Sequence, residues 1–256
     1  MLHPIPRLMI INPYRFASAG TGIPEPLHYY DLNDLSGGIT DQGTGNWGAL
    51  SSVVGAPSVS SGTAPDGSGD CLDFTPTDDL TELAKPWDGA QDNMTISAWV
   101  NADSISSTRN LIVNWQSGTP DYIAGLQIRN ATTDHWIYTL YETPTFYNAL
   151  DTAESWGTTG NWYHIVATYD GTDMKIYKGT TSSAPSNDLV VTFNSPSRVF
   201  PSGNADFSLG RNSTSTATTQ AHDGKLFAVG IWDVALTTTQ MDELWNNGDG
   251  RTFSQL

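Results

Sequence analysis

The sequence contains one cysteine, few basic residues and no long apolar run. Cys71 is alone among 256 residues, so no disulfide can form within the chain. Lysine and arginine number 11 against 27 aspartates and glutamates, which gives a net charge of −16. Nucleic-acid phosphates repel such an acidic chain, so nucleic-acid binding is not expected. No run of about 18 apolar residues occurs, and we therefore expect no membrane insertion.

Short alternating segments and abundant turn residues predict an all-β fold. Glycine and proline number 24 and 14, and serine and threonine fill the gaps between short apolar runs. In residues 162–179, apolar and polar residues alternate on both sides of Asp170-Gly171, a pattern typical of a β-hairpin. The chain is long enough for one large β domain with a buried core.

One helix is predicted over residues 237–247, close to the end of the chain. Thr237 and Gln240 have the spacing of a capping box, and Gly248 supplies a C-terminal stop. Its apolar stripe consists of Leu236, Met241, Leu244 and Trp245. The sequence therefore predicts one short C-terminal helix beside many strands.

Several segments, taken in order, resemble the laminin-G-like branch of the concanavalin A-like jelly rolls. The resemblance covers roughly residues 27–250. It is carried by the hairpin at 162–179 and by Leu27–Leu32, Cys71–Phe74, Met94–Asn101, Ser208–Arg211 and Gly224–Trp232. It implies a single β-sandwich domain over residues 27–256, of a class that consists mostly of surface-binding modules. Thr75-Pro76 departs from the Asp-Gly usual in the family, which weakens a ligand role for that loop.

The resemblance also raises the possibility of an enzyme, because the superfamily includes glycoside hydrolases. Retaining hydrolases need two carboxyl groups about 5–5.5 Å apart, which in the related enzymes come from glutamates alternating along one strand. No two of the five glutamates here lie within ten residues of each other. Gly-x-Ser-x-Gly is also missing, and the histidines are scattered. We therefore expect a non-catalytic protein, with a glycoside hydrolase as the weaker alternative.

Residues 1–26 are predicted to form an arm that precedes the domain. Residues 1–24 contain two arginines and no acidic residue, unlike the rest of the chain. Pro4, Pro6 and Asn12 interrupt the apolar residues, so we expect no secretory signal peptide. The arm is expected to add a strand to a sheet or to dock in a partner. Its candidate partner-binding residues are Leu8, Met9, Ile10, Ile11, Pro13, Tyr14, Arg15 and Phe16. Alternatively, residues 8–11 are the first strand of the jelly roll.

The segment Ile11–Phe16 resembles openings of structural proteins from tailed phages. That resemblance implies a virion-surface protein, assembled in the host cytoplasm and acting as a capsid decoration or structural module. Its expected partners are the major capsid protein or another virion protein, and further copies of the chain in a homo-oligomer such as a trimer. The alternative is a glycan-binding adhesin, a phage fibre or host-attachment module, whose partner would be a cell-surface glycan.

The nine tryptophans must be divided between the core and the surface. Trp99, Trp162 and Trp232 lie in motif strands, and we expect them in the core. Aromatic rings beside asparagine, aspartate and glutamine are typical of sugar-binding surfaces, because the ring stacks on the apolar face of a sugar. The glycan-binding candidates of this kind are Trp115, Trp136, Tyr138, Tyr141 and Tyr147. A packing role for most of them is the alternative.

Calcium is the cofactor that the resemblance makes most credible, as a structural ion near the rim of the sandwich. Its candidate ligands are Asp31, Asp41 and Asp223, because the resemblance places the first and last strands side by side. Aspartates in tight turns explain the same residues without a metal. His164 is expected to be a hydrogen-bonded structural residue, and Cys71 a buried small apolar side chain.

Overall fold

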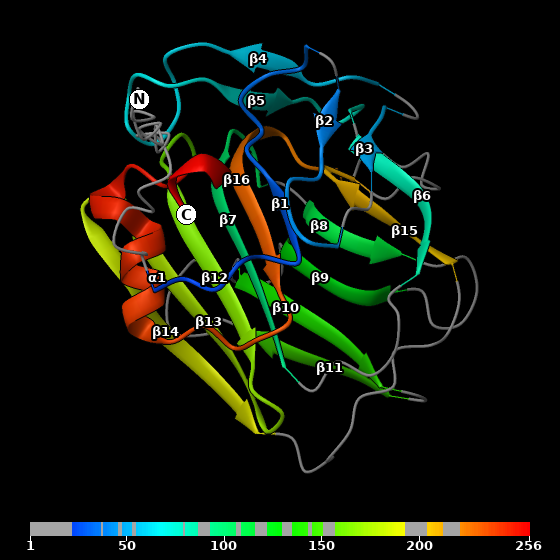
Figure 1. Ribbon diagram of the computed structural model, residues 1–256, viewed down its shortest axis with the longest axis vertical. Helices are drawn as coiled ribbons and strands as arrows, with labels where there is room; N and C mark the ends of the chain where they lie inside the picture. The colour runs from blue at the N-terminus through cyan, green and yellow to red at the C-terminus, as the bar shows by residue number, and fades with distance from the viewer. Residues whose placement is uncertain are drawn as a thin grey trace, which may run out of the picture.

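Two antiparallel sheets pack face to face, and one helix lies on the outside of the larger sheet (Figure 1). The computed structural model describes residues 22–36, 38–45, 48–52, 55–78, 80–86, 93–105, 109–115, 122–129, 135–142, 145–150, 157–192, 204–211 and 221–256. The predicted β-sandwich with a short C-terminal helix is confirmed. No helix in these ranges is long and apolar enough to cross a membrane.

The larger sheet has eight strands. In spatial order they are β14 (Ser183–Thr192), β13 (Asp173–Thr180), β12 (Tyr163–Tyr169), β7 (Met94–Ala102), β16 (Gly224–Trp232), β5 (Cys71–Phe74) and β4 (Ser58–Ser60), while β1 (His28–Tyr30) also pairs with β16. The motif segments expected from the sequence thus lie in this sheet although they are far apart along the chain, except for Ser208–Arg211, which begins within β15 (Asn204–Leu209) of the smaller sheet.

The smaller sheet has six strands. In spatial order they are β11 (Thr145–Leu150), β10 (His135–Glu142), β9 (Tyr122–Arg129), β8 (Arg109–Trp115), β15 (Asn204–Leu209) and β6 (Leu80–Pro86). A separate short pair consists of β2 (Ile39–Thr40) and β3 (Ala49–Leu50). In Figure 1 this pair lies near the end of the sandwich, beside β1 and β6.

The predicted hairpin is confirmed as β12 and β13. The carboxylate of Asp170 accepts the backbone N–H groups of Thr172 and Asp173 at 3.0 and 2.7 Å. Gly171 supplies the positive φ of 91° that the turn requires. Pairing runs from Tyr163 opposite Thr180 to Tyr169 opposite Met174. The alternating sequence thus places one row of side chains between the sheets and the other row outside.

Two apolar clusters stabilise the domain. One lies between the sheets, and the other lies on the outer face of the larger sheet, beneath the helix. Trp99 and Trp232 are buried in the outer cluster, whereas Trp162 is only partly buried at its edge. The expected core position is therefore confirmed for two of the three tryptophans. Cys71 is buried in the same cluster, as expected.

The helix α1 (Thr238–Trp245) begins as predicted and ends earlier than predicted. Thr237 caps it, and the side chain and backbone of Thr237 and Gln240 form the expected capping box. The left-handed C-cap is Asn246, with φ of 53°, and not Gly248. A short 3-10 helix, η3 (Asn246–Gly248), follows, and η4 (Phe253–Gln255) lies near the chain end. Gly248 has no room for a side chain, because the carbonyl of Thr181 packs against it.

The last residues of the segment assigned to the arm make contacts with the domain. Gln240 Nε2 donates to the carbonyl of Gly22 at 2.8 Å, and Trp232 Nε1 donates to that of Pro24 at 2.9 Å. Ile23 packs against the outer apolar cluster. The partner-binding candidates at 8–16 lie outside the described residues, so their role stays a prediction.

These contacts predict different stabilities for chains that start at Gly22 and at Leu27. The shorter chain leaves Trp232 Nε1 buried without its acceptor and loses the packing of Ile23. We expect its free energy of unfolding to be lower by about 1–3 kcal/mol. Urea unfolding of both chains, followed by tryptophan fluorescence, measures the difference. Equal midpoints would contradict a structural role for residues 22–26.

A second prediction concerns His164. Its Nε2 lies 2.8 Å from Ser97 Oγ and its ring stacks on Trp99, which confirms the structural role expected for it. Burial lowers the pKa of His164 from its ordinary 6.5 to about 3. As the pH falls from 6.5 towards 3, His164 becomes protonated in the unfolded chain but stays neutral in the native protein. Stability should therefore fall over this window, by at most about 1.4 kcal/mol per pH unit.

The variant His164→Gln separates this effect from the titration of carboxylates. Glutamine keeps a hydrogen-bonding group for Ser97 but does not titrate. We expect a lower stability at pH 7 and a shallower loss between pH 6.5 and 4. Urea unfolding at several pH values tests this, and parallel curves for the two proteins would contradict it.

Candidate functional site

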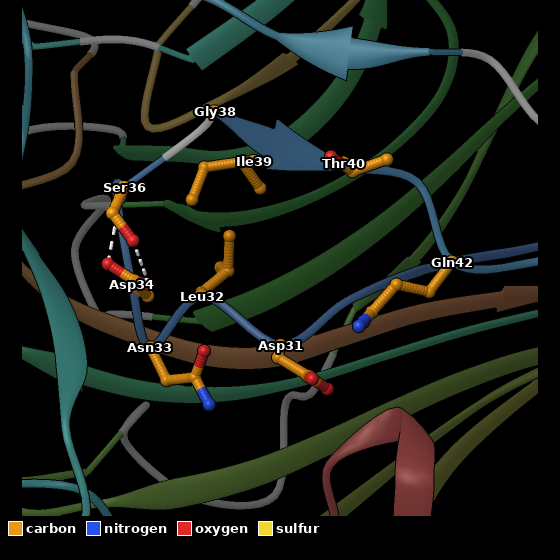
Figure 2. A pocket seen from close by; sticks show the side chains of 9 residues that line it. All are labelled: Asp31, Leu32, Asn33, Asp34, Ser36, Gly38, Ile39, Thr40 and Gln42. Carbon is orange, nitrogen blue, oxygen red and sulfur yellow. Dashed lines mark hydrogen bonds between the residues drawn. The ribbon is translucent and has the colours of Figure 1, made fainter.

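A polar cavity of about 180 Å³ opens in the loop between β1 and β2 (Figure 2). It is lined by Asp31, Leu32, Asn33, Asp34, Ser36, Gly38, Ile39, Thr40 and Gln42. Leu32 and Ile39 are buried, and Figure 2 shows their side chains pointing toward each other. Asp31 and Asn33 point away from this apolar pair. The cavity thus presents carboxylate, amide and hydroxyl groups, whereas Leu32 and Ile39 belong to the core between the sheets and anchor the loop there.

Buried Asp41 fixes the far end of the loop. Its carboxylate lies 2.6 Å from Nδ1 of His28 and accepts the backbone N–H groups of Tyr29 and Gly43 at 3.1 and 3.0 Å. These contacts join the chain just after β2 to β1, so the two ends of the loop are held together. Asp41 therefore acts as a structural anchor beside the cavity.

Asp31 fixes the near end of the loop to the C-terminal segment. Its carboxylate accepts the backbone N–H of Phe253 at 2.6 Å, and its carbonyl accepts that of Ala228 at 3.1 Å. Burial raises the pKa of the Asp31 carboxyl, although hydrogen bonds from Phe253 and Gln42 oppose the rise. Two parts of the chain 222 residues apart thus meet at this side chain.

The backbone at this point is strained. Leu32 and Ala228 have positive φ values of 56° and 51°, in the left-handed region that favours glycine. Such residues persist only where the surroundings hold them, and they are frequent at ligand-binding sites. Here the contacts of Asp31 and the burial of Leu32 hold them in place.

A second cavity, of about 210 Å³, shares Asn33 with the first. Its other lining residues are Ala64, Asp66, Gly69, Asp70, Phe227, Asn246, Asp249, Gly250, Thr252 and Gln255. Asp66 is held in its own turn by the backbone N–H groups of Ser68 and Gly69 at 2.9 and 2.7 Å. We call the two adjoining cavities the rim groove. The groove joins the β1–β2 loop, the turn at 61–70 and the C-terminal segment.

The charge of the rim groove has one sign. Asp31, Asp34, Asp66, Asp70 and Asp249 line it, and neither cavity is lined by a lysine or arginine among the described residues. The hydroxyl and backbone N–H of Ser36 hold the pKa of Asp34 below its usual range, so this carboxyl is charged at neutral pH. Anionic ligands are repelled by such a lining, whereas neutral polar ligands find many hydrogen-bond acceptors.

Two of the predicted glycan-binding residues are in the core, which corrects that prediction. Trp136 and Tyr138 are 0% exposed and pack between the two sheets. A ring that is completely covered cannot stack on a sugar. Trp115, Tyr141 and Tyr147 lie in β8, β10 and β11, and their side chains are outside the described residues. Their role stays a prediction.

The three aspartates predicted to bind calcium have other partners in the structure, and their role as metal ligands stays a prediction. Asp41 is committed to His28 and to backbone N–H groups, and Asp31 to Phe253. Asp223 precedes β16 and accepts the N–H of Asp103 with its backbone carbonyl. No group of three or more histidine, cysteine, aspartate or glutamate side chains with metal-binding geometry occurs among the described residues.

The rim groove contains residues that the sequence did not single out. Asn33, Asp34, Thr40 and Gln42 lie in a stretch rich in glycine, serine and aspartate, which signals only a loop. Of the predicted site residues whose side chains the structure describes, Asp31 alone lines it. Nothing in the local sequence shows that this loop meets residues 246–255.

Comparison with solved structures finds the same fold in proteins of low identity. Domain 4 of AbnA, a GH43 extracellular arabinanase from Geobacillus stearothermophilus in complex with arabinotriose, has a TM-score of 0.63 and 17% identity, over 88% of this chain and 98% of that domain. A Trypanosoma rangeli sialidase has a TM-score of 0.52 and 14% identity, over 87% of this chain and 33% of the sialidase. The enzymatically active domain of a bacteriophage CBA120 tailspike has a TM-score of 0.52 and 13% identity, over 74% of this chain and 29% of the tailspike chain.

Comparison with protein families gives the assignment. No curated protein matches the sequence. The laminin-G-type family model described as the concanavalin A-like lectin/glucanases superfamily matches residues 77–241, which is more than half of the chain. The matched region runs from before β6 into α1 and so includes most strands of both sheets. The chain belongs to the concanavalin A-like lectin/glucanases superfamily.

Proposed function

We propose that this protein is a non-catalytic glycan-binding module and that the rim groove holds the sugar. The observation that carries the proposal is the composition of the groove. Carboxylates, amides and hydroxyls converge there on a loop fixed by Asp31 and Asp41, and Leu32 and Ile39 anchor that loop in the core. The many hydroxyl groups of a sugar can exchange hydrogen bonds with such a lining.

The comparison with domain 4 of the arabinanase supports this proposal. The likeness extends over almost the whole of that domain, which was solved in complex with arabinotriose. At 17% identity the likeness concerns the fold, so the position of the site rests on the groove of this chain.

The charge of the groove defines the class of glycan. Five aspartates line the two cavities, and the whole chain has a net charge of −16. Glycans with sialic or uronic acids would bring negative charge into this lining. We therefore propose a neutral glycan, whose hydroxyl groups donate to the carboxylate and amide oxygens.

The absence of catalysis is part of the proposal. Burial raises the pKa of the Asp31 carboxyl, which makes it a candidate proton donor, yet this carboxylate already accepts a hydrogen bond from the backbone N–H of Phe253. Asp66 and Asp34 each accept hydrogen bonds from their own turns. These carboxylates organise loops, and the sequence lacks the closely spaced glutamates of the related hydrolases.

Asn33→Ala tests the groove, because Asn33 lines both of its cavities. We expect the protein to bind oligosaccharides of a neutral polysaccharide such as arabinan, xylan or glucan, and the variant to bind about tenfold more weakly, as loss of amide hydrogen bonds implies. Isothermal titration calorimetry measures both proteins. Because the ligand is neutral, the Kd should change by less than about twofold between low and high salt.

Thr239→Ala is the control, since Thr239 is exposed on α1 and lines neither cavity. It should bind like the unaltered protein. Chromatography of the incubated sugars should detect no shorter products. Release of shorter sugars would contradict the non-catalytic proposal. Equal affinities of Asn33→Ala and the unaltered protein, or tighter binding of polygalacturonate than of neutral sugars, would contradict the proposed site or ligand class.

A location on a phage particle is a second proposal, and it is compatible with glycan binding. It is supported by the resemblance of residues 11–16 to phage structural proteins and by the fold similarity to a bacteriophage tailspike domain. In this proposal the segment before Gly22 attaches the domain to a capsid or other virion protein, as a monomer or an oligomer.

Removal of residues 1–21 tests this attachment while keeping the contacts of Gly22 and Pro24 with the domain. We expect the shortened chain to bind glycans like the full chain but to lose co-sedimentation with phage particles stripped of this protein. Solution mass from light scattering shows whether oligomers are lost as well. Unchanged co-sedimentation would contradict attachment through the arm.

A further inference from the structure

A third cavity, of about 250 Å³, lies where β12 begins and β13 turns into β14. It is lined by Asn161, Trp162, Tyr163, Thr180, Thr181 and Ser182. Trp162 is partly buried, whereas Asn161 and Ser182 are exposed. An indole ring thus stands beside an amide and three hydroxyl groups on the surface of the domain.

The aromatic side of this cavity is fixed by hydrogen bonds. Trp162 Nε1 donates to the carbonyl of Thr63 at 2.9 Å, which sets the orientation of the indole. The Tyr163 hydroxyl accepts the backbone N–H of Thr158 at 2.8 Å. Gly157 lies against the Tyr163 ring and leaves no space for a side chain there. Both rings are therefore held before any ligand arrives.

The hydroxyl side of the cavity is held by the C-terminal segment. Trp245 Nε1 donates to the carbonyl of Thr180 at 2.7 Å, and Gly248 packs against that of Thr181. Within the turn, the hydroxyls of Thr180 and Ser182 lie 3.2 Å apart. A site built from fixed groups loses little conformational entropy on binding.

The lining of this cavity carries no charged side chain among the residues that the structure describes. These lining residues include no lysine, arginine, aspartate, glutamate or histidine. A flat ring flanked by amide and hydroxyl groups suits a neutral sugar, which stacks its C–H face on the ring and exchanges hydrogen bonds at its edge. This is the same ligand class that the charge of the rim groove indicates.

The third cavity and the rim groove are neighbours across a single turn. The carbonyl of Thr63 accepts the bond from Trp162, and the next residue, Ala64, lines the rim groove. Ala64 is buried, and in the turn at 61–70 its backbone N–H donates to the carbonyl of Gly69 while its carbonyl accepts the N–H of Gly67. One ligand chain that crosses this turn would therefore reach both sites.

We propose that the third cavity is a second sugar subsite and that the ligand is an extended neutral oligosaccharide, bound at once in the rim groove and on Trp162. The proposal rests on the proposed function, because it assumes that the rim groove binds sugar. It adds that affinity depends on chain length and that Trp162 contributes only when the chain is long enough to cross residues 61–70.

The test is a length series from disaccharide to hexasaccharide of the neutral glycan that the unaltered protein binds, beginning with arabino-oligosaccharides. The unaltered protein should bind the hexasaccharide about tenfold more tightly than the disaccharide. Trp162→Ala should lose this gain while its disaccharide affinity stays the same. Asn33→Ala should weaken the binding of both lengths.

Two further variants keep the test valid if Trp162→Ala alters the fold. Trp162→Phe keeps an aromatic ring at the edge of the apolar cluster, and Asn161→Ala removes only an exposed amide. Each should lower the affinity for the hexasaccharide alone, by a smaller factor than Trp162→Ala. Thr239→Ala should match the unaltered protein at every length. Thermal unfolding of each variant verifies the fold.

The outcomes separate the two proposals. Equal length dependence in the unaltered protein and all Trp162 and Asn161 variants would overturn the second subsite and leave the rim groove in place. If Trp162→Ala lost disaccharide binding while Asn33→Ala kept it, the order of the sites would be overturned, and Trp162 would belong to the primary site. If the unaltered protein binds no neutral oligosaccharide of any length, the proposed function itself fails.

Discussion

The docking of residues 237–256 onto the larger sheet and its loops is the constraint on which both candidate sites depend. Trp245 bonds to Thr180 and so holds the β13–β14 turn, while the backbone N–H of Phe253 bonds to Asp31 and holds the β1–β2 loop. The Tyr29 hydroxyl adds a bond to the carbonyl of Arg251 at 2.6 Å. This short terminal segment therefore holds both the β1–β2 loop, near the start of the domain, and the β13–β14 turn, about 150 residues later. Its own position follows from the apolar stripe of α1, which is buried against the outer face of the sheet.

The same docking explains why the sites lie at loops and not on the outer face of the larger sheet. The part of that face that lies beneath α1 is covered by the helix and by an apolar cluster that includes Trp99 and Trp232, so a ligand cannot reach it there. At strand ends and turns, the backbone N–H and carbonyl groups need partners that the ladders do not supply. Asp41 and Asp31 provide such partners and so fix the loop that lines the cavity. Binding groups on fixed loops are a common solution in sandwich folds.

The fold could be predicted from the sequence because it depends on local patterns. Alternation around Asp170-Gly171 specifies the hairpin, and the Thr237–Gln240 box specifies the start of α1. The same alternation could have placed Trp136 and Tyr138 in the core, since they stand two residues apart on β10 and share a face. Their polar neighbours in the sequence instead favoured an exposed position for these two rings. The rim groove could not be predicted, because its walls come from segments more than 200 residues apart, and only tertiary packing brings Phe253 to Asp31.

The two proposed neutral-sugar sites, separated by one turn, would also account for the kind of specificity that this surface can achieve. None of the three cavities exceeds about 250 Å³, so each of them alone would give a sugar unit modest affinity. A chain held at both sites gains affinity because the second contact is intramolecular. The aspartates of the rim groove exclude anionic sugars by repulsion, and the fixed indole of Trp162 favours an apolar sugar face. Discrimination would thus arise from spacing and charge together. The turn at 61–70 sets the spacing, and the aspartates of that turn, of the β1–β2 loop and of the C-terminal segment set the charge.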